Sequence, residues 1–577
     1  MKAQWCDGSF VPLNNPLSTI DQNPKPQTLE TMKSKLKFSM AAAAAMAASG
    51  TFAQAIGSSC GCPDVSARTT VTLDPTNAPT VLDAQGNLIP ASYTMTCNNL
   101  YILNDRFYVG AGKDLYIEPG TVIKAPNIGG GNAAALIISR DGQIWANGSE
   151  SCPIIFTSTA DGLDGNYPVT NRGKWGGVIL LGKAYNNVRS TDVGSVSITT
   201  GAGSGDGLGL IEGLLNGDAR NFYGNPVGTW VNDDNSGVLR YVSIRHGGEK
   251  LGTNNEINGL TLGSVGSGTT IDHVEVIGNL DDCFEFFGGT VNAKYLIGMH
   301  SDDDGLDWDQ GYSGKIQFYY GLQGPENNAG VLAQGDNGLE LDSDDNSTNF
   351  TNGGLRSTAE IWNATVFART DGSNVAPNLN PAPADEAIEA KERTFGAVNN
   401  SIFVNFRSGL NLAGAVGAGN TTDFWQAGNF NVKNCTFVGC TNPLRINGAN
   451  VAAGADFTKF TVTDKNVILA SGLVDATFDV ATLTSNNVID RVNPVPAAGT
   501  ATTDLKVPVS EPFYSNAPFR GAFEPGKAPW TQGWTLAADI GSDLSAVAGC
   551  TGDLNKDGQI NATDFGLFVN VFNTNCY

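Results

Sequence analysis

The chain has 577 residues, a formal net charge of −23 and 71 glycines. Because nucleic acids and anionic membrane surfaces repel such a charge, it argues against both as partners. The many aspartates, asparagines and glycines instead suit tight turns and cations held by oxygen ligands.

The first 55 residues indicate export. Residues 1–31 contain no targeting pattern, and we interpret them as an over-called start of the reading frame. Residues 32–55 have a basic beginning, an alanine-rich apolar run and the small-x-small sequence Ala53-Gln54-Ala55, which together predict a secretory signal peptide. The apolar run is too short to span a bilayer. We therefore expect a secreted protein, extracellular or associated with the cell surface, and no transmembrane span.

A polar segment, 56–97, is followed by a body, 98–540, that we predict to be all-β. Short β-rich runs separated by Gly, Pro, Asn and Asp begin at Leu100–Ile102 and recur with no helical period. Residues 184–236 and 371–386 are rich in turn-forming residues, and they are predicted to be insertions on the surface of this body.

A short motif recurs in the middle of the body. Asp281–Gly289 and Asp303–Gly311 share two acids, an apolar residue, an acid, an apolar residue and a closing glycine, and Asp336–Asp342 is a further copy. A unit that returns every twenty-odd residues indicates a solenoid. Its alternation of period two makes each unit a strand.

The two faces of these strands differ in chemistry. Pairs such as Phe284 and Phe286 face one way, and the residues between the pairs face the other way and form a ladder, namely Thr261, Glu285, Asp307, Glu340 and Asn411. A second strand series at His273–Val276, Tyr295–Ile297 and Gln317–Tyr320 stays in step, twenty-two residues apart. Two strand columns in phase predict a parallel β-helix.

Several longer motifs carry a resemblance to a known family. They are WGGVILLG, YVSIRHGG, EINGLTLGSVGSGTTIDHVEV, FEFFGGTVN and GAFEPG followed by GWT. With them the body resembles large secreted or surface proteins of environmental bacteria with a pectin-lyase-like fold. The resemblance implies a right-handed parallel β-helix solenoid and assigns no activity. The exposed edge of its final coil requires a cover, and we expect the aromatics of Phe519–Phe523 and Trp530–Trp534 to supply it.

The ladder carries the candidate chemistry. Carboxylates one coil apart are separated by about 4.8 Å, so they require a cation, a shared proton or a neighbouring base. The candidate catalytic residues are Glu285, Asp307 and Glu340. The candidate substrate or cation groove consists of Asp281, Asp282, Asp303, Asp304 and Asp336.

Three interpretations of the ladder stay open. It is a calcium ladder or a solvated acidic face, a carbohydrate groove, or a catalytic site. The groove would use Trp308, Tyr319 and Tyr320 as stacking platforms unless these fill the core. Hydrolysis would use two carboxylates about 5 Å apart, as in a retaining mechanism. A lyase would need a base, for which the basic residues nearby in sequence are Arg245, Lys294 and Lys315.

The resemblance to pectin-active enzymes is partial. Asp281-Asp282-Cys283 is similar to the acid pair of polygalacturonases, but their Gly-His-Gly and Arg-Ile-Lys motifs are absent. His246 and His300 each end a strand of the second series, two coils apart. At about 10 Å they are too distant to share a metal, so we expect turn histidines bonded to the backbone.

Export permits disulfides, and the chain beyond the signal peptide has an odd number of cysteines: 60, 62, 97, 152, 283, 435, 440, 550 and 576. At least one is therefore unpaired within the chain. We expect Cys283, inside the repeated motif, to be free and to act as an apolar filler. Cys550 and Cys576 bracket the C-terminal module and are predicted to pair.

The C-terminal module, 546–577, contains a calcium-loop pattern. Acids or amides occupy loop positions one, three, five, nine and twelve, and Gly558 stands at position six, where a sharp turn is needed. The predicted ligands are Asp553, Asn555, Asp557, Gln559 through its carbonyl, Asn561 and Asp564. The loop resembles that of a dockerin, which implies a cohesin-like partner, but dockerins carry two such loops and this chain has one.

The sequence thus predicts a secreted, calcium-binding parallel β-helix that binds or adheres to extracellular polysaccharide. The alternative is a polysaccharide hydrolase or lyase that uses the stacked acids.

Overall fold

The computed structural model describes residues 56–130, 133–164, 167–188, 207–211, 214, 218–226, 228–252, 255–323, 325–328, 331–334, 336–343, 356–368, 386–414, 420–478, 490–497, 505–506 and 511–540. All of them belong to one structural unit, Ala55–Ser545. In this described part of the chain, no helix has both the length and the apolar character needed to cross a membrane.

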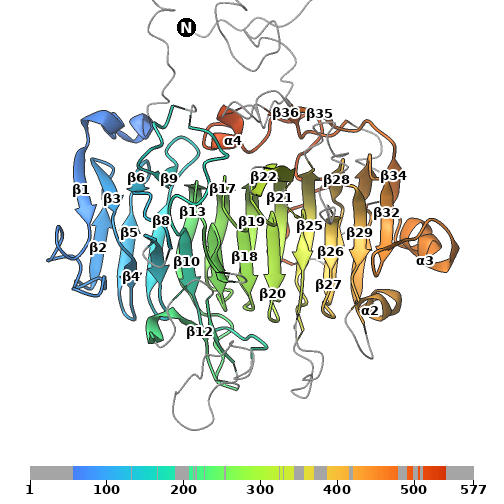
Figure 1. Ribbon diagram of the computed structural model, residues 1–577, viewed down its shortest axis with the longest axis horizontal. Coiled ribbons are helices and arrows are strands. Elements are labelled where there is room, and N and C mark those ends of the chain that lie inside the picture. Colours follow the sequence, from blue (N-terminus) through green and yellow to red (C-terminus); the bar gives the residue numbers. More distant parts are fainter. Residues whose placement is uncertain are drawn as a thin grey trace, which may run out of the picture. The chain divides into compact units, whose positions relative to one another are not determined.

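Parallel strands stacked coil upon coil form this unit (Figure 1). One sheet, which we call the ladder sheet, contributes one strand per coil: β4 (Phe107–Val109), β7 (Leu136–Ile138), β10 (Val178–Leu181), β16 (Leu260–Gly263), β18 (Phe284–Phe287), β20 (Leu306–Asp309), β24 (Glu340–Leu341), β26 (Glu386–Ala390), β29 (Ser408–Leu412) and β32 (Asn442–Ile446), ending in the antiparallel β33 (Ala449–Asn450).

The other large sheet, the broad sheet, pairs only in parallel among the described residues. Its strands are β1 (Thr69–Leu73), β2 (Ser92–Met95), β3 (Asn99–Leu103), β5 (Asp114–Ile117), β6 (Val122–Ala125), β8 (Gln143–Asn147), β9 (Ile154–Ser158), β13 (Gly237–Arg245), β17 (Thr270–Ile277), β19 (Asn292–Met299), β21 (Lys315–Leu322), β25 (Glu360–Phe367), β27 (Gly396–Asn399), β28 (Ile402–Val404), β30 (Phe430–Lys433), β31 (Thr436–Val438) and β34 (Val467–Leu469). The predicted parallel β-helix is confirmed.

Short hairpins and helices decorate the coils. The hairpins are β11 (Leu208–Leu210) with β12 (Phe222–Gly224), β14 (Glu249–Gly252) with β15 (Asn255–Ile257), β22 (Pro325–Asn328) with β23 (Val331–Gln334), and β35 (Asp475–Phe478) with β36 (Asp490–Asn493). The helical segments are η1 (Ser58–Cys60), η2 (Val65–Ala67), η4 (Ala219–Asn221), α2 (Thr421–Ala427), α3 (Gly454–Thr458), η5 (Lys459–Thr463) and α4 (Leu536–Asp539).

The predicted facing of the central strands is confirmed. Phe284 and Phe286 are fully buried in the core, together with Leu306 and Trp308 of the next coil. Burying each such side chain stabilises the fold by about 1.5–3 kcal/mol. Since side chains alternate along a strand, this packing turns the intervening residue of each strand away from the core.

The long strands of the broad sheet bend at a single residue in the left-handed conformation. Tyr241, His273, Tyr295 and Phe318 have φ of 48°, 56°, 56° and 64°. Such a conformation costs a non-glycine residue about 1–2 kcal/mol. Stacking of the rings offsets this, because consecutive ring centroids lie 4.3, 4.2 and 4.8 Å apart. We call these four residues the corner aromatics.

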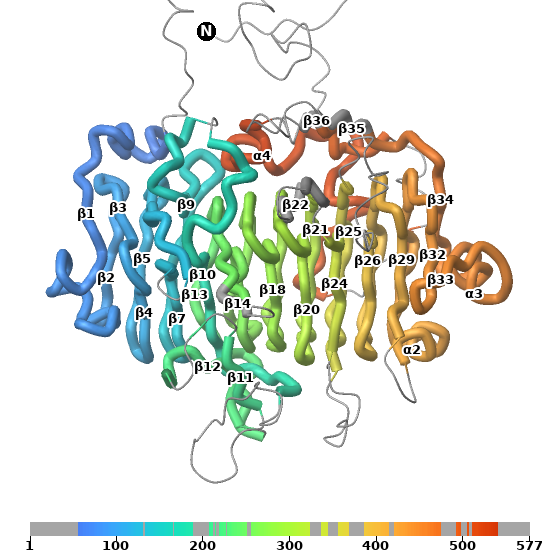
Figure 2. The backbone as a smooth tube through the Cα atoms, in the orientation of Figure 1, coloured from blue at the N-terminus to red at the C-terminus, as the bar shows by residue number. Residues whose placement is uncertain are grey.

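The C-terminal segment 511–540, which we call the strap, covers the corner aromatics. Phe519 stacks on Phe318, and Trp530 and Trp534 pack edge-on against Tyr295 and Tyr241. Figure 2 shows this part of the chain returning across the coils toward α4. The prediction that these aromatics cap the final coil is therefore wrong, because the outward corner aromatics form an apolar stripe that itself needs a cover.

The final coil is covered by a different segment. Phe460 of η5 is fully buried and packs on Phe437 of β31 with ring centroids 5.3 Å apart. Val451 and Phe457 also pack against the core cluster. Residues that follow the last ladder-sheet strand thus shield the open end of the solenoid.

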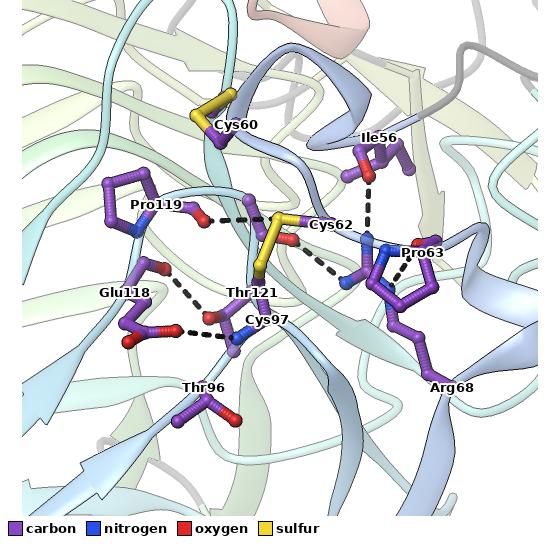
Figure 3. The surroundings of a disulfide bond; sticks show 12 residues. Ile56, Cys60, Cys62, Pro63, Arg68, Thr96, Cys97, Glu118, Pro119 and Thr121 are labelled. Carbon is purple, nitrogen blue, oxygen red and sulfur yellow. Dashed lines mark hydrogen bonds between the residues drawn. A yellow bond between two sulfur atoms is a disulfide. The ribbon is translucent and has the colours of Figure 1, made fainter.

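The β-helix begins earlier than predicted. β1 and β2 lie in the segment 56–97, and they pair in parallel with β3 and β5. Two disulfides that the sequence pattern does not reveal, Cys60–Cys152 and Cys62–Cys97, tie this region together. Arg68 adds hydrogen bonds from Nη1 to the Gly120 carbonyl, 2.8 Å, and from Nη2 to the Ile56 carbonyl, 2.6 Å (Figure 3).

The insertion predicted at 184–236 contributes buried apolar side chains, which its composition does not indicate. Its Val188, Ile211, Leu214 and Tyr223 are buried in one cluster with outward apolar residues of the ladder sheet, among them Ile179. The described part of the insertion therefore covers the outer face of the first coils. The other predicted insertion, 371–386, lies outside the described residues except for Glu386.

Candidate functional site

One outward column of the ladder sheet carries the predicted acids. Glu285 on β18 lies opposite Asp307 on β20, and Asp307 lies opposite Glu340 on β24. This predicted order of neighbours is confirmed. The column continues to Glu389 on β26, which the sequence motif does not reveal, and then to Asn411. We call Glu285, Asp307, Glu340 and Glu389 the acidic ladder.

The acidic ladder is buried at its first two residues. Glu285 and Asp307 are each only 8% exposed, although both point away from the apolar core. Glu340 and Glu389 are half-buried. The interpretation as a solvated acidic face is therefore wrong for Glu285 and Asp307. Ionised carboxylates held one coil apart in a buried position are unfavourable unless a cation, a proton or a base compensates.

A second ladder runs along the turn that precedes these strands. Oδ1 of Asn258 accepts the backbone N–H of Asp282 at 3.1 Å, and Oδ1 of Asp282 accepts that of Asp304 at 2.8 Å. Oδ1 of Asp304 in turn accepts the backbone N–H of Asn337. One oxygen of Asp282 and one of Asp304 thus link successive coils, and both side chains are buried.

Three carboxylates converge where the two ladders meet. Asp282, Glu285 and Asp307 each offer one oxygen, and these oxygens lie within 4.8 Å of one another. Among the described residues, Oδ1 of Asp307 is buried without a hydrogen-bond partner. A donor set made only of carboxylate oxygens suits calcium. We call these three residues the acid triad.

The next group of three carboxylates along the column is in contact with a lysine. Asp307, Glu340 and Asp342 also bring one oxygen each within 4.8 Å. The ammonium of Lys391 contacts Oε1 of Glu340 and lies 3.4 Å from Oδ2 of Asp342. Burial lowers the pKa of Lys391, but the charges of Asp342 and Glu340 outweigh burial and raise it. Lys391 thus supplies the positive charge that this group requires.

Asp281 of the groove and the neighbouring Asp302 have basic partners as well. Lys250, on the β14–β15 hairpin, lies 3.8 Å from Asp281 and 3.7 Å from Asp302. Arg172 pairs with Asp302 at 2.5 Å. Neither base follows from the sequence pattern, because each lies far in sequence from the acids that it meets.

The bases expected for a lyase lie elsewhere. Lys294 and Lys315 belong to the broad sheet and meet the strap: Lys294 lies over the Phe513 ring at 4.7 Å, and Lys315 pairs with Glu511 at 2.7 Å. Arg245 donates from Nε to the Ser243 hydroxyl at 2.8 Å. Their nearness in sequence to the acidic ladder therefore does not give the base that a lyase would need there.

Burial and crowding change the acidity of the ladder. Burial raises the pKa of Asp307 well above its ordinary value, and the charges of Glu340 and Glu285 raise it further. Burial, with the neighbouring acids, also raises the pKa of Asp282 and Asp304. Protons are therefore held tightly wherever no cation neutralises these groups.

The pKa values of Glu340, Asp303 and Asp336 are shifted in different directions. Burial raises the pKa of Glu340, but the charge of Lys391 and hydrogen bonds, one of them from Asp304, outweigh burial and lower it. Burial first and Glu340 second raise the pKa of Asp303 to about 6, and burial first and Asp303 second raise that of Asp336 to about 8.

The proposed stacking platforms belong to the core. Trp308, Tyr319 and Tyr320 are fully buried, so none of them presents a ring to a ligand. His246 and His300 are buried at left-handed turn positions with φ of 60° and 55°. Cys283 is free, as predicted, and its thiol donates to the Met299 carbonyl at 3.6 Å.

The predicted C-terminal calcium loop falls outside the described residues. This applies to all six predicted ligands and to the predicted Cys550–Cys576 pair. The signal peptide and residues 1–31 also lie outside them. Within the described part of the chain, Cys435 and Cys440 are free and buried, together with Cys283.

Comparison with known proteins agrees with the architecture. The family model described as pectate-lyase like beta helix domain matches residues 87–214 and 216–481. No curated protein matches the chain. The matched residues amount to more than half of the chain and contain the acidic ladder, the acid triad and Lys391. The chain therefore belongs to the family of pectate-lyase-like β-helix domains, whose character points to a function related to polysaccharides.

Proposed function

We propose that this chain is an exported β-helix that binds polysaccharide and that uses calcium in the acid triad to hold its coils together. The observation that carries the calcium site is the convergence of Asp282, Glu285 and Asp307 around the unpartnered oxygen of Asp307. A divalent cation there neutralises carboxylates that otherwise have to retain protons. Family membership supports the polysaccharide as ligand.

One calcium is expected in the ladder. The group formed by Asp307, Glu340 and Asp342 already contains the ammonium of Lys391. A divalent cation beside that ammonium would be repelled at close range. Among the described residues, Asp282, Asp303 and Asp304 form a third such group, which shares Asp282 with the acid triad. The acid triad contains the unpartnered oxygen of Asp307 and is the preferred position.

Binding agrees with the burial of the ladder better than hydrolysis does. A glycosidase places its two carboxyl groups on either side of a glycosidic bond. Glu285 and Asp307 are each 8% exposed, which leaves a sugar ring no access between their carboxyl groups. Calcium in this position acts on the fold, by joining the coils of β18 and β20.

Hydrolysis is the second candidate, and one observation favours it. The pKa of Asp307 is raised, chiefly by burial, while that of the neighbouring Glu340 is lowered overall by Lys391 and hydrogen bonds that outweigh burial. Carboxyl groups whose pKa values are pushed apart are the arrangement that acid and base catalysis uses. The acid would be Asp307 and the carboxylate Glu340.

Export and a second calcium site belong to the same proposal. The disulfides Cys60–Cys152 and Cys62–Cys97 suit an oxidising compartment outside the cytosol. We infer that the C-terminal loop, with ligands from Asp553 to Asp564, binds a calcium of its own and offers a docking module to a cohesin-like partner. The loop pattern alone supports this part.

The calcium site is tested by the Asp307→Asn variant. We expect it to bind one equivalent of calcium fewer than the unsubstituted chain in a calorimetric titration. Asp557→Ala should remove a different equivalent, that of the C-terminal loop. In chelator, Asp307→Asn should melt at the same temperature or higher, because it removes a crowded acid. In calcium, it should melt at a lower temperature than the unsubstituted chain.

Glu389→Gln is the matched control for this titration. Glu389 lies in the same column and is half-buried, but among the described residues it belongs to none of the carboxylate groups that are close enough to hold a cation. Glu389→Gln should therefore bind as many equivalents of calcium as the unsubstituted chain. Equal calcium counts for Asp307→Asn and the unsubstituted chain would contradict the site.

Binding and cleavage are separated with a panel of acidic and neutral glycans in calcium. We expect retention of at least one glycan, with neither new reducing ends nor the absorbance of unsaturated products. Products that disappear in Asp307→Asn and in Glu340→Gln would favour the hydrolase instead. A chain that retains no glycan and forms no product would contradict both candidates.

A further inference from the structure

The outer face of the broad sheet carries a second aromatic cluster, which is partly exposed. Tyr116 on β5 is 41% exposed, and Trp145 on the adjacent β8 is half-buried. The described part of the strap packs on the corner aromatics. Of the large hydrophobic side chains that the structure describes as exposed, Tyr116 is the aromatic one.

The two rings are held in one orientation. Tyr116 and Trp145 are register partners in neighbouring coils, and their ring centroids lie 6.2 Å apart with 14° between the planes. Nε1 of Trp145 donates to Oδ1 of Asp114 at 2.9 Å, which fixes the indole. A fixed pair of nearly parallel, stacked rings loses little conformational entropy when a ligand packs on an outward ring face.

Polar side chains surround the pair on the same face. Thr94 precedes Tyr116 in the column, and Asn147 stands two residues after Trp145, so by strand alternation both face the same way. Both are exposed. Glu118 is exposed too and places an acid beside the rings, where it accepts the backbone N–H of Cys97 at 3.1 Å.

We propose that Tyr116 and Trp145 form a stacking platform for a neutral polysaccharide. The apolar C–H face of a pyranose ring packs on an aromatic face, while its hydroxyl groups bond with side chains such as those of Thr94 and Asn147. The negative charge of Glu118, in a chain with net charge −23, disfavours uronates at this place. Successive coils present successive rings, which matches the linear repeat of a sugar chain.

The platform deepens the proposed function, since it names where and with which class of polysaccharide the chain interacts. It is separate from the acid triad, which lies on the ladder sheet. Binding at the platform should therefore be independent of calcium wherever the fold is intact. Failure of the platform and failure of the calcium site are then distinguishable.

The test is a titration of the full chain with cellohexaose, xylohexaose and mannohexaose, followed by tryptophan fluorescence and calorimetry. We expect one of the three to bind, and Tyr116→Ala to weaken that binding about tenfold, equivalent to about 1.4 kcal/mol. Trp145→Phe, which keeps a ring but loses the bond to Asp114, should weaken it less. Asp307→Asn should bind the sugar as the unsubstituted chain does.

Val462→Ala is the matched control, because Val462 is 69% exposed and lies far along the chain at the other end of the coils. Tyr116→Ala, Trp145→Phe and Val462→Ala should each melt within about 1 °C of the unsubstituted chain. The proposal is overturned if none of the three oligosaccharides binds, or if Tyr116→Ala binds as tightly as Val462→Ala. A change in molar mass on Tyr116→Ala without sugar binding would likewise overturn it, by assigning the rings to a second copy of the chain.

Discussion

Lys391→Met is expected to lower the free energy of unfolding at pH 7 by about 3 kcal/mol. Lys391 contacts Glu340 and lies 3.4 Å from Asp342, whose side chain is buried. Methionine has nearly the same length but no charge, so the two acids lose their counter-ion while the packing of the stem is kept. Removing one partner of a buried ion pair is costly because the other remains unpaired.

Chemical denaturation of both proteins in chelator measures this loss. Lys527→Met is the matched control, since Lys527 is exposed and such substitutions change stability by less than about 0.5 kcal/mol. Calcium should restore part of the loss in Lys391→Met, because the vacated group then accepts a second divalent cation. A loss below about 1 kcal/mol, with no extra calcium bound, would show that Lys391 is not the counter-ion of this group.

The sequence predicts the ladder because its motif is local. Alternation in Phe284-Glu285-Phe286 assigns the faces, and the spacing of twenty-two residues places Glu285 beside Asp307. The next spacing is longer, yet Gly338-Leu339-Glu340-Leu341 repeats the motif closely enough to locate Glu340. Here local pattern and global register agree, which is the condition under which sequence-based inference succeeds.

Glu389 shows where the motif stops being informative. It lies in Ala387-Ile388-Glu389-Ala390, with Ile388 and Ala390 in place of the aromatic and leucine pairs and with no closing glycine. The register still places it beside Glu340. A ladder residue in a strand that lacks the motif can be located only after the coils are assembled.

Contacts between residues that are distant in sequence could not be predicted. Lys250 reaches Asp281 from a hairpin, and the disulfide Cys60–Cys152 joins residues 92 positions apart. The same holds for the strap, in which backbone N–H groups of Leu536 and Ala537 donate to Glu275 at 3.0 and 2.8 Å. Charge and aromatic content indicate that such groups need partners, but topology decides which ones.

The two aromatic clusters of the broad sheet show how context separates packing from binding. The corner aromatics require the strap because their rings would otherwise form a wide exposed stripe. Tyr116 and Trp145 are a smaller pair within a polar surround, and the fold tolerates their exposure. Sequence alone cannot distinguish the clusters, since each consists of outward aromatic residues on consecutive strands.

Asp336→Asn is expected to remove a pH dependence of stability that runs opposite to the usual one. Burial, and after it the charge of Asp303, raises the pKa of Asp336 to about 8 in the folded chain, against about 3.9 for an unfolded aspartate. Between these values the folded state binds the extra proton. The free energy of unfolding therefore falls as the pH rises from about 4 to about 8.

The size of the effect follows from the same linkage. One extra proton bound by the folded state corresponds to a slope of at most about 1.4 kcal/mol per pH unit, and partial solvent exposure of Asp336 lowers it. Asparagine has no proton to lose. The variant should match the unsubstituted chain near pH 4 and exceed it in stability near pH 8, with the difference growing steadily between them.

Denaturation in chelator at half-unit steps of pH measures this difference. Asp233→Asn, at an exposed position, is the matched control and should give a difference that stays near zero throughout. Calcium should reduce the effect for Asp336, because a cation in the nearby acid triad weakens the crowding of the ladder. If the two substitutions give the same pH profile, Asp336 is ionised in the folded chain at neutral pH. The ladder would then hold its charges without retained protons, and calcium would not be needed to neutralise them.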